Sequence, residues 1–416
     1  MSFPEVTAAN VAEVLRMTLR SKLMKKSKFL SIATVGFGFC SIIFGWDQQD
    51  MDSPKELVIC NEENGYRDLI AVPDLSSFRR IPWENNVPFF VVRFLDPDTR
   101  EPVCACSRGL LKNATAKVEA AGYRAMAGGV FYDNPPFSSE YKFCHFRIPG
   151  DRFSPERAPS GIPSFLQNNS VDSLPSLNRG EDYHDSIFDA CEQFHCDTEE
   201  WSAKALPALL KLYAVKAYGI KHGVIPCFMA KPRHGLPGNG GYMNISLITT
   251  DGQNAFTRDI PDPSPYPDRL VEDFSAPNTV SWGLEHRAES IQLITPATAN
   301  ANTTRFEIRV PGADANPHFV LAAIIALGWF GVEKKLEIPV PPLPKGEDMS
   351  GASVKSMPLA KSLKEVVTKF TRPDSVAREV FGDSFVEHFG GTREHEIRLW
   401  EEAVTDWEVR RYIETV

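Results

Sequence analysis

The segment Thr304–Val310, with the sequence TRFEIRV, alternates polar and apolar residues. In an extended strand successive side chains point to opposite faces, so Arg305, Glu307 and Arg309 share one face and the apolar residues face the core. Two guanidinium groups beside a carboxylate suit a polyanion such as a nucleotide phosphate or a substrate carboxylate. A solvated strand face with cross-strand ion pairs gives the same pattern. The flanking sequence has to decide between these interpretations.

A helix start follows this segment at Asn316 and Pro317. Asparagine is a good N-cap, and proline fits the first helical turn. The predicted helix runs to about Lys335. It is apolar on all sides over 319–330, so we expect it to be buried, and this apolar run is too short to span a membrane.

An uncharged segment at 29–46 follows Lys25, Lys26 and Lys28, and at first sight it resembles a signal anchor. Three glycines and several hydroxyl side chains interrupt it, and it is barely long enough to cross a bilayer. We therefore predict a buried strand pair or a helix-to-strand passage, and no membrane partner.

The composition is that of an ordinary globular protein. The chain has 416 residues, of which 43% are hydrophobic and 24% are charged. A net charge of −9 argues against a nucleic-acid partner, because phosphate binding requires a basic face. None of the eight cysteines forms a CxxC pair, so we expect reduced thiols in a cytoplasmic protein and no structural zinc site.

Strand and helix patterns follow one another without strict alternation, which predicts an α+β fold. We expect a basic amphipathic helix in residues 1–27, a smaller domain over 28–106 and a larger domain over 107–416, with Ser107 capping its first helix. The smaller domain should contain a buried strand at 88–95. The other expected elements are helices over about 181–195 and 205–222, strands over 223–229 and 242–247, and a closing amphipathic helix with Ile397, Trp400, Val404 and Trp407 on one stripe.

The segments around the charged strand resemble the signature region of the glutamine synthetase family. In that family an Arg-bearing loop, here within Trp282–Leu293, precedes an R-x-E-x-R strand and a buried helix that begins with Asn-Pro. Further segments match in the same order: Phe37–Asp47, Val72–Asp74, Ala121–Gly128, Phe228–Pro232 and Trp400–Tyr412. Within the family, these segments resemble most the prokaryotic-type branch found in fungi. It implies an N-terminal β-grasp-like domain and then a glutamine synthetase-type catalytic domain, a curved antiparallel sheet with outer helices.

Members of this family are ATP-dependent carboxylate–amine ligases that bind two or three divalent ions. The ions polarise the phosphates, glutamate attacks the γ-phosphate, and ammonia displaces phosphate from the acyl phosphate. By resemblance, the catalytic positions are Arg287, Arg305 and Glu307. The substrate and nucleotide positions also include Arg269, Glu272, Gly238 and Arg309. ATP is therefore an implied ligand, with Mg²⁺ or Mn²⁺ as the implied metal.

Several metal positions of the family are replaced here. Val130 and Tyr132 stand where the family has Glu-x-Glu, and Tyr242 and Asn244 stand where it has His-x-His. The family's second pair of metal glutamates falls in a segment that is missing between Glu200 and Lys204, and a further stretch is missing between Phe256 and Tyr266. Mis-splicing would explain the missing segments but not the four replacements. Glu307, helped by Glu272, remains as a weak ligand, so we expect metal binding to be weak or absent.

Three functions remain open on the sequence. The first is a ligase that joins glutamate or another small-molecule acid to ammonia or another amine. The second is a non-catalytic member, a pseudoenzyme that assembles as a homo-oligomer or with an active paralogue. The third is a binder of an anionic metabolite through the arginines. The sequence fixes neither the substrate nor the ring size.

Overall fold

The computed structural model describes most of the chain, and its residues divide into two compact units. The described residues are 22–47, 49–53, 55–126, 139–147, 181–194, 209–231, 238–256, 279–286, 289–295, 304–343, 357–360 and 362–413. The first unit comprises 1–23, 74–91 and 111–359, and the second comprises 24–73, 92–110 and 360–416. Each unit is described by itself below.

The second unit contains a three-stranded antiparallel sheet with the order β1-β2-β5. Its strands are β1 (Phe37–Cys40), β2 (Asp68–Pro73) and β5 (Val92–Leu95). Strand β2 alternates in exposure, which places Leu69 and Ala71 in the core. Phe94 packs there against Val103 and Cys106. The β-grasp topology itself stays a prediction.

The uncharged segment at 29–46 is a helix-to-strand passage, as predicted. Helix α1 (Lys26–Ile32) is followed by β1 and by the 3₁₀ helix η2 (Ser41–Phe44). Gly36 has a φ of +84°, in the left-handed region that favours glycine, and it turns the chain between α1 and β1. The segment therefore does not form one continuous apolar helix.

The C-terminal helices belong to the same unit as this sheet. They are α7 (Leu363–Thr371), α8 (Val376–Phe381), α9 (Asp383–Glu402) and α10 (Asp406–Tyr412). From α9, His388 Nε2 lies 3.1 Å from the Phe44 carbonyl oxygen, and His395 Nε2 lies 3.1 Å from Asp47 Oδ2. The packing units are thus interleaved along the chain, although the sequence suggests a single boundary near residue 106.

The closing helix predicted from the sequence is interrupted. Helix α9 ends at Glu402, and α10 starts after Thr405, whose side chain forms a capping box with Glu408. The predicted apolar stripe is consequently split between two helices. Its members Trp400 and Trp407 are 75% and 62% exposed, and Val404 between them is also exposed.

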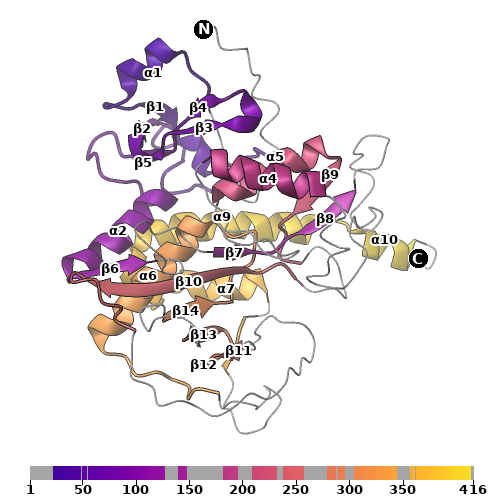
Figure 1. Ribbon diagram of the computed structural model, residues 1–416. Coiled ribbons are helices and arrows are strands. Elements are labelled where there is room, and N and C mark those ends of the chain that lie inside the picture. Colours follow the sequence, from indigo (N-terminus) through magenta and orange to yellow (C-terminus); the bar gives the residue numbers. More distant parts are fainter. Residues whose placement is uncertain are drawn as a thin grey trace. The chain divides into compact units, whose positions relative to one another are not determined.

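The first unit is built on a mixed sheet of six strands (Figure 1). Strand β14 lies inside it, between β13 and β10, as the alternation in TRFEIRV predicts. All neighbours are antiparallel except β12 and β13, which are parallel, so the expected all-antiparallel sheet is wrong at this edge. The strands are β6 (Tyr123–Met126), β7 (Ser139–Tyr141), β10 (Gly241–Thr249), β12 (Trp282–Leu284), β13 (Ile291–Ile294) and β14 (Arg305–Ile308).

Short strand pairs and helices complete this unit. The predicted strand at 88–95 is broken after Phe89, because β4 pairs with β3 whereas β5 belongs to the other sheet. Helix α2 starts at Ser107, the residue predicted to cap it, and contributes residues to both units. The remaining elements are β3 (Arg79–Ile81), β4 (Val87–Phe89), β8 (Cys144–Arg147), β9 (Val224–Cys227), β11 (Thr279–Val280), β15 (Met357–Pro358), η3 (Leu75–Ser77), η4 (Pro82–Glu84), α2 (Ser107–Ala120), α4 (Glu181–Gln193) and α5 (Leu209–Lys221).

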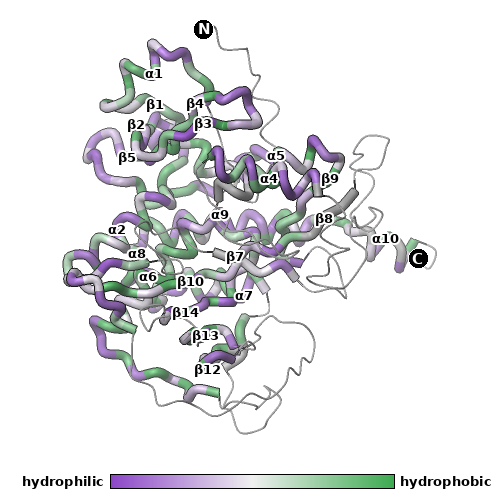
Figure 2. Tube along the Cα trace, in the orientation of Figure 1, coloured by the Kyte–Doolittle hydropathy of each residue, from purple (hydrophilic) through white to green (hydrophobic). Residues whose placement is uncertain are grey.

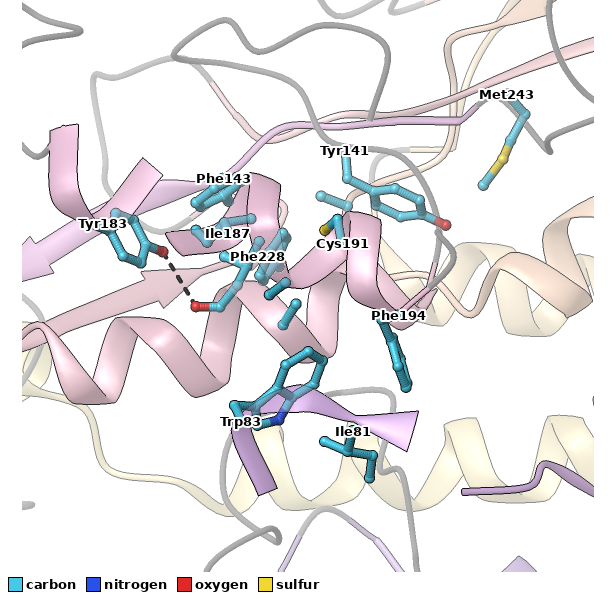
Figure 3. Packing of buried hydrophobic residues seen from close by; sticks show 14 of the residues in the cluster. Ile81, Trp83, Tyr141, Phe143, Tyr183, Ile187, Cys191, Phe194, Phe228 and Met243 are labelled. Atoms are coloured by element: carbon cyan, nitrogen blue, oxygen red, sulfur yellow. Dashed lines mark hydrogen bonds between the residues drawn. The ribbon is translucent and has the colours of Figure 1, made fainter. Parts of the chain in front are cut away.

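The main core of the first unit lies among α4, α5, η4 and β10 (Figure 3). The ring of Trp83 meets that of Phe194 edge-on, with centroids 5.1 Å apart. The Tyr183 hydroxyl is fully buried and donates to the Val215 carbonyl oxygen at 3.3 Å. Met243 of β10 belongs to the same cluster, so one side of β10 is fixed against this core.

Helix α6 (Pro317–Lys334) begins as predicted, with the Asn316 side chain accepting from the His318 amide at 3.0 Å. Figure 2 shows its hydrophobic sequence. Leu321 and Ile325 are buried, but Leu327 is exposed, so the expectation of burial on all sides is wrong. Among the described helices, α6 is long and apolar enough by composition to cross a membrane. Because part of it packs into the core of the first unit, a core helix explains the same composition.

Candidate functional site

The charged strand β14 shares one sheet face with polar residues of β10 and β13. Asn244 of β10 lies opposite Glu307, and Glu307 lies opposite Gln292 of β13. Residues two apart in a strand share a face, so Arg305 and Arg309 flank Glu307 on the side of Asn244. Three neighbouring strands therefore bring polar side chains into one row in the middle of the sheet.

Hydrogen bonds and an ion pair order this face. Arg305 Nε donates to Asn244 Oδ1 at 3.0 Å. Arg309 Nη2 donates to the Tyr242 hydroxyl at 3.3 Å, and Arg309 Nε lies 3.3 Å from Glu307 Oε2. Arg309 is only 7% exposed, so its charge is held in a largely dehydrated position. A fully solvated strand face is therefore excluded at Arg309.

Two cationic groups approach the ring of Tyr242. The Lys142 ammonium lies 3.9 Å from the ring centroid, and the Arg309 guanidinium lies 4.7 Å from it. Both distances fall within the range of cation–π attraction. Gly240 makes room for the ring, because a Cβ there would lie 2.4 Å from a carbon of the Tyr242 ring. The Gly240 carbonyl also accepts from the Lys142 amide at 2.9 Å and holds that residue beside it.

A second acidic residue lies close to this network. Glu289 is fully buried, and its Oε1 lies 3.2 Å from His286 Nδ1. Burial raises the pKa of Glu289, while a hydrogen bond from Ser281 and the positive charges of His286 and Arg309 oppose that rise. Burial thus opposes ionisation of the Glu289 carboxyl group, while the neighbouring positive charges favour it.

Two of the predicted catalytic residues, Arg305 and Glu307, lie together on this face. Gly238 lies at a close backbone crossing instead, where a Cβ would lie 2.6 Å from the Ala230 carbonyl oxygen. Its neighbour Asn239 donates to the Cys227 and Met229 carbonyl oxygens. The other predicted site positions lie outside the described residues: Arg269, Glu272, Arg287, Val130 and Tyr132.

Sequence reasoning missed Lys142 and the strand that precedes it. Strand β7 pairs with β10 and places Glu140 at the register position opposite Tyr242. Glu140 and Lys142 are two residues apart, the spacing of a Glu-x-Glu pair, and this spacing was the available signal.

The described part of the chain offers no cluster of three or more His, Cys, Asp or Glu side chains that could hold a metal ion. At the two positions where the resemblance implies histidine, Tyr242 and Asn244 supply a phenol and an amide. The Asn244 amide accepts a hydrogen bond from Arg305 of β14, and the Tyr242 hydroxyl accepts one from Arg309, directly after that strand. A neutral phenol is a poor ligand for Mg²⁺ or Mn²⁺, and the amide oxygen of Asn244 already accepts a hydrogen bond from Arg305.

Comparison with known proteins identifies the fold and its lineage. The family described as "Glutamine synthetase, catalytic domain" matches residues 194–265 and 260–412. The chain is 30% identical to Type-1 glutamine synthetase 2 of Dictyostelium discoideum, over 96% of this chain and 82% of that protein. The chain belongs to the glutamine synthetase family.

The chain is also similar to other members of the glutamine synthetase family. The glutamate–isopropylamine ligase of a Pseudomonas species is 27% identical over 95% of this chain and 92% of its own length. The gamma-glutamylethanolamide synthetase GlnA4 of Streptomyces coelicolor is 24% identical over 90% of this chain and 85% of its own length. The solved structure of a GmaS/ADP complex matches 95% of this chain and 94% of its own chain, with a TM-score of 0.68 and 21% identity, and supports the fold alone.

Proposed function

We propose that this protein is a carboxylate–amine ligase of the glutamine synthetase family in which ordinary metal-dependent glutamine formation is impaired or repurposed. The supporting observation is the engagement of Tyr242 and Asn244 by Arg309 and Arg305. These two positions are where the family resemblance implies imidazole ligands. A pair of hydrogen-bonded phenol and amide groups gives a divalent ion a poor site.

Arg305 of β14 and Arg309, directly after it, are the proposed anion-binding groups. Guanidinium groups bind carboxylate and phosphate with paired hydrogen bonds. We assign Arg305 and Arg309 to the nucleotide phosphates or the acid substrate, with Glu307 orienting Arg309 through their ion pair. Arg287, Arg269 and Glu272 keep their proposed substrate or nucleotide roles by resemblance. Gly238 keeps a proposed role in the loop before β10.

We also propose that Glu140 and Lys142, rather than Val130 and Tyr132, stand at the Glu-x-Glu metal positions. The support is the register of β7, which places Glu140 opposite Tyr242 on the sheet that holds Glu307. One of the two metal carboxylates would then be kept and the other replaced by an ammonium group. That exchange reverses one charge at the proposed metal position.

The amine substrate is ammonia or a small organic amine, and the acid is glutamate or a related compound. Two relatives support the wider choice, since their names give isopropylamine ligation and γ-glutamylethanolamide synthesis. The test is ATP turnover with glutamate and each amine in Mg²⁺ or Mn²⁺, with the Dictyostelium relative as the positive control. We expect little or no metal-dependent turnover. Tight stoichiometric Mn²⁺ binding together with γ-glutamyl transfer would restore the ordinary ligase.

The second candidate is a non-catalytic family member that assembles with copies of itself or with an active paralogue. Exposed large apolar side chains at Trp400, Val404 and Trp407 of the second unit favour assembly. Light scattering after size exclusion should show an oligomer under this hypothesis. A monomer at micromolar concentration would contradict self-assembly, and addition of an active paralogue would then test the mixed complex.

A further inference from the structure

Two cysteines occupy one register position in the antiparallel pair of β8 and β9. Cys144 of β8 and Cys227 of β9 are direct Cα partners. They are 83 positions apart in sequence, so the strand pairing alone brings them together. Both belong to the first unit. A cysteine pair at one register position is a candidate for a disulfide bond between two strands.

The separation of the two backbones fits such a bond. Pro226 lies opposite His145 and has no N–H, so this pair does not exchange two backbone hydrogen bonds. Hydrogen-bonded and non-hydrogen-bonded pairs alternate along an antiparallel ladder, so the next pair, Cys144 and Cys227, is a hydrogen-bonded one. The Cα atoms of such a pair are about 5.5 Å apart, and disulfide bonds span about 4.4–6.8 Å between Cα atoms. The backbone separation therefore allows the bond.

Cys227 also has a cation close to it. This half-buried cysteine ends β9, and Lys216 of α5 interacts with it electrostatically. Lys216 Nζ lies 5.6 Å from the ring centroid of Phe228, the next residue along the chain. A neighbouring ammonium group stabilises a thiolate, the nucleophilic form of cysteine. Burial instead raises the pKa of Cys60 and of Cys104 to about 11, so these two thiols stay protonated near neutral pH.

Both strands continue into segments of the candidate site. Lys142, two residues before Cys144, approaches the ring of Tyr242. The Cys227 carbonyl oxygen accepts from the Asn239 side chain at 3.1 Å, three residues before Tyr242. A cross-link between β8 and β9 would therefore tie together two segments that contact or precede this tyrosine.

We propose that Cys144 and Cys227 form a reversible disulfide bond on reaction with a low-molecular-weight disulfide such as oxidised glutathione, and that this bond restrains the segments around Tyr242. The Cys227 thiolate attacks one sulfur of the oxidant, which gives a mixed disulfide and releases one glutathione thiolate. The Cys144 thiolate then attacks Cys227 Sγ, closes the bond and expels the second glutathione thiolate. The expelled thiolates take up the two protons that the cysteines lost.

Two electrons thus pass from the protein to the oxidant, and an excess of reduced thiol reverses both steps. Disulfide bonds in reducing compartments are typically transient and redox-sensing, which agrees with a reversible bond here. The proposal does not rest on the ligase function.

Disulfide mapping of the folded full chain tests the bond. After treatment with oxidised glutathione, alkylation and digestion, mass spectrometry should find the peptides of Cys144 and Cys227 linked, and dithiothreitol should release them. Cys144→Ser should stop at the mixed disulfide of Cys227 with glutathione. Cys104→Ser, at another half-buried cysteine, is the matched control and should leave the link unchanged. A folded wild-type chain without this linked peptide, or with Cys227 linked to a different cysteine, would overturn the proposal.

Alkylation kinetics test the cation beside Cys227. In the Cys144→Ser background, Lys216→Met should slow the reaction of Cys227 with iodoacetamide at pH 7 by about threefold or more, because the thiolate loses a stabilising charge. Lys112→Met, at an exposed lysine of α2, should leave this rate unchanged. Equal rates in both lysine variants would overturn the role of Lys216 in the first step. The mapping of the wild-type chain stays decisive if a variant does not fold.

Hydrogen exchange of the reduced and the oxidised chain tests the restraint around Tyr242. The Lys142 amide donates to the Gly240 carbonyl oxygen, and the Gly241 amide donates to that of Pro311. We expect both amides to exchange more slowly after oxidation, because the cross-link holds the segments that carry them. Unchanged exchange at both amides in a chain shown to be oxidised would overturn the proposed restraint.

Discussion

Replacing His388 should remove a large part of the acid sensitivity of the second unit. This histidine lies on α9, is 3% exposed, and its Nε2 donates to the Phe44 carbonyl oxygen. Burial lowers the pKa of His388 to about 4 from the ordinary 6.5, although the bond to Phe44 opposes that change. The folded protein therefore holds this imidazole neutral in a range where the unfolded chain protonates it.

The magnitude follows from the two pKa values. The unfolded chain binds the proton first as the pH falls, so the free energy of unfolding decreases from about pH 6.5 and the decrease is complete below about pH 4. Each pH unit in that window corresponds to about 1.4 kcal/mol, which gives a total of about 3 kcal/mol. This is a large fraction of the stability of a typical domain.

Urea unfolding of the wild type and of His388→Gln at pH 7, 6, 5 and 4 measures the effect. Glutamine keeps an amide donor for the Phe44 carbonyl but does not titrate. The stability difference between the two proteins should shift by about 3 kcal/mol in favour of the variant between pH 7 and pH 4. His222→Gln, at an exposed histidine of the first unit, controls for loss of an imidazole. Parallel pH profiles of wild type and His388→Gln would refute the reasoning.

Three further changes test the packing of the first unit. Lys216→Met should raise the unfolding free energy at pH 7 by about 1–3 kcal/mol, and with it the melting temperature, because burial lowers the pKa of Lys216 to about 8 and disfavours its charged form. This gain in stability should shrink as the pH rises from 8 to 10.5, and a gain independent of pH would contradict this cause. Phe194→Ala should lower the unfolding free energy in urea by about 3–5 kcal/mol, because the fully buried ring packs on Trp83 and leaves a cavity. Asn316→Ala should cost about 1 kcal/mol in thermal unfolding by removing the cap bond to His318, and Asn316→Ser, which keeps a capping oxygen, should cost less.

Local patterns predicted the elements that local chemistry controls. The alternation around Glu307 predicted an interior strand, and Asn316 with Pro317 predicted the start of α6. The glycines after residue 35 predicted the passage from helix to strand. In each case the deciding side chains are neighbours in sequence, so no distant partner had to be known.

The features that the sequence did not predict depend on strand pairing and packing between residues far apart in the sequence. The apolar run at 88–95 looks like one strand, but its two halves pair with strands of different units. Helix α6 is apolar all round, yet only packing shows that Leu321 is buried and Leu327 is exposed. Tyr242 and Lys142 are 100 positions apart, and only the pairing of β7 with β10 brings them together.

The buried pair of Asp47 and His395 has a consequence for synthesis of the chain. Its members are 348 residues apart in sequence, and both belong to the unit that includes the first sheet. A ribosome adds about 5–20 residues per second, so about 20–70 s separate the emergence of the two partners. During that interval Phe44 and Asp47 lack their partners on α9, and chaperones or proteases meet this part of the chain before α9 is made. Ribosomal pausing before codon 395 should therefore lower the yield of folded protein more than pausing of equal length before codon 47.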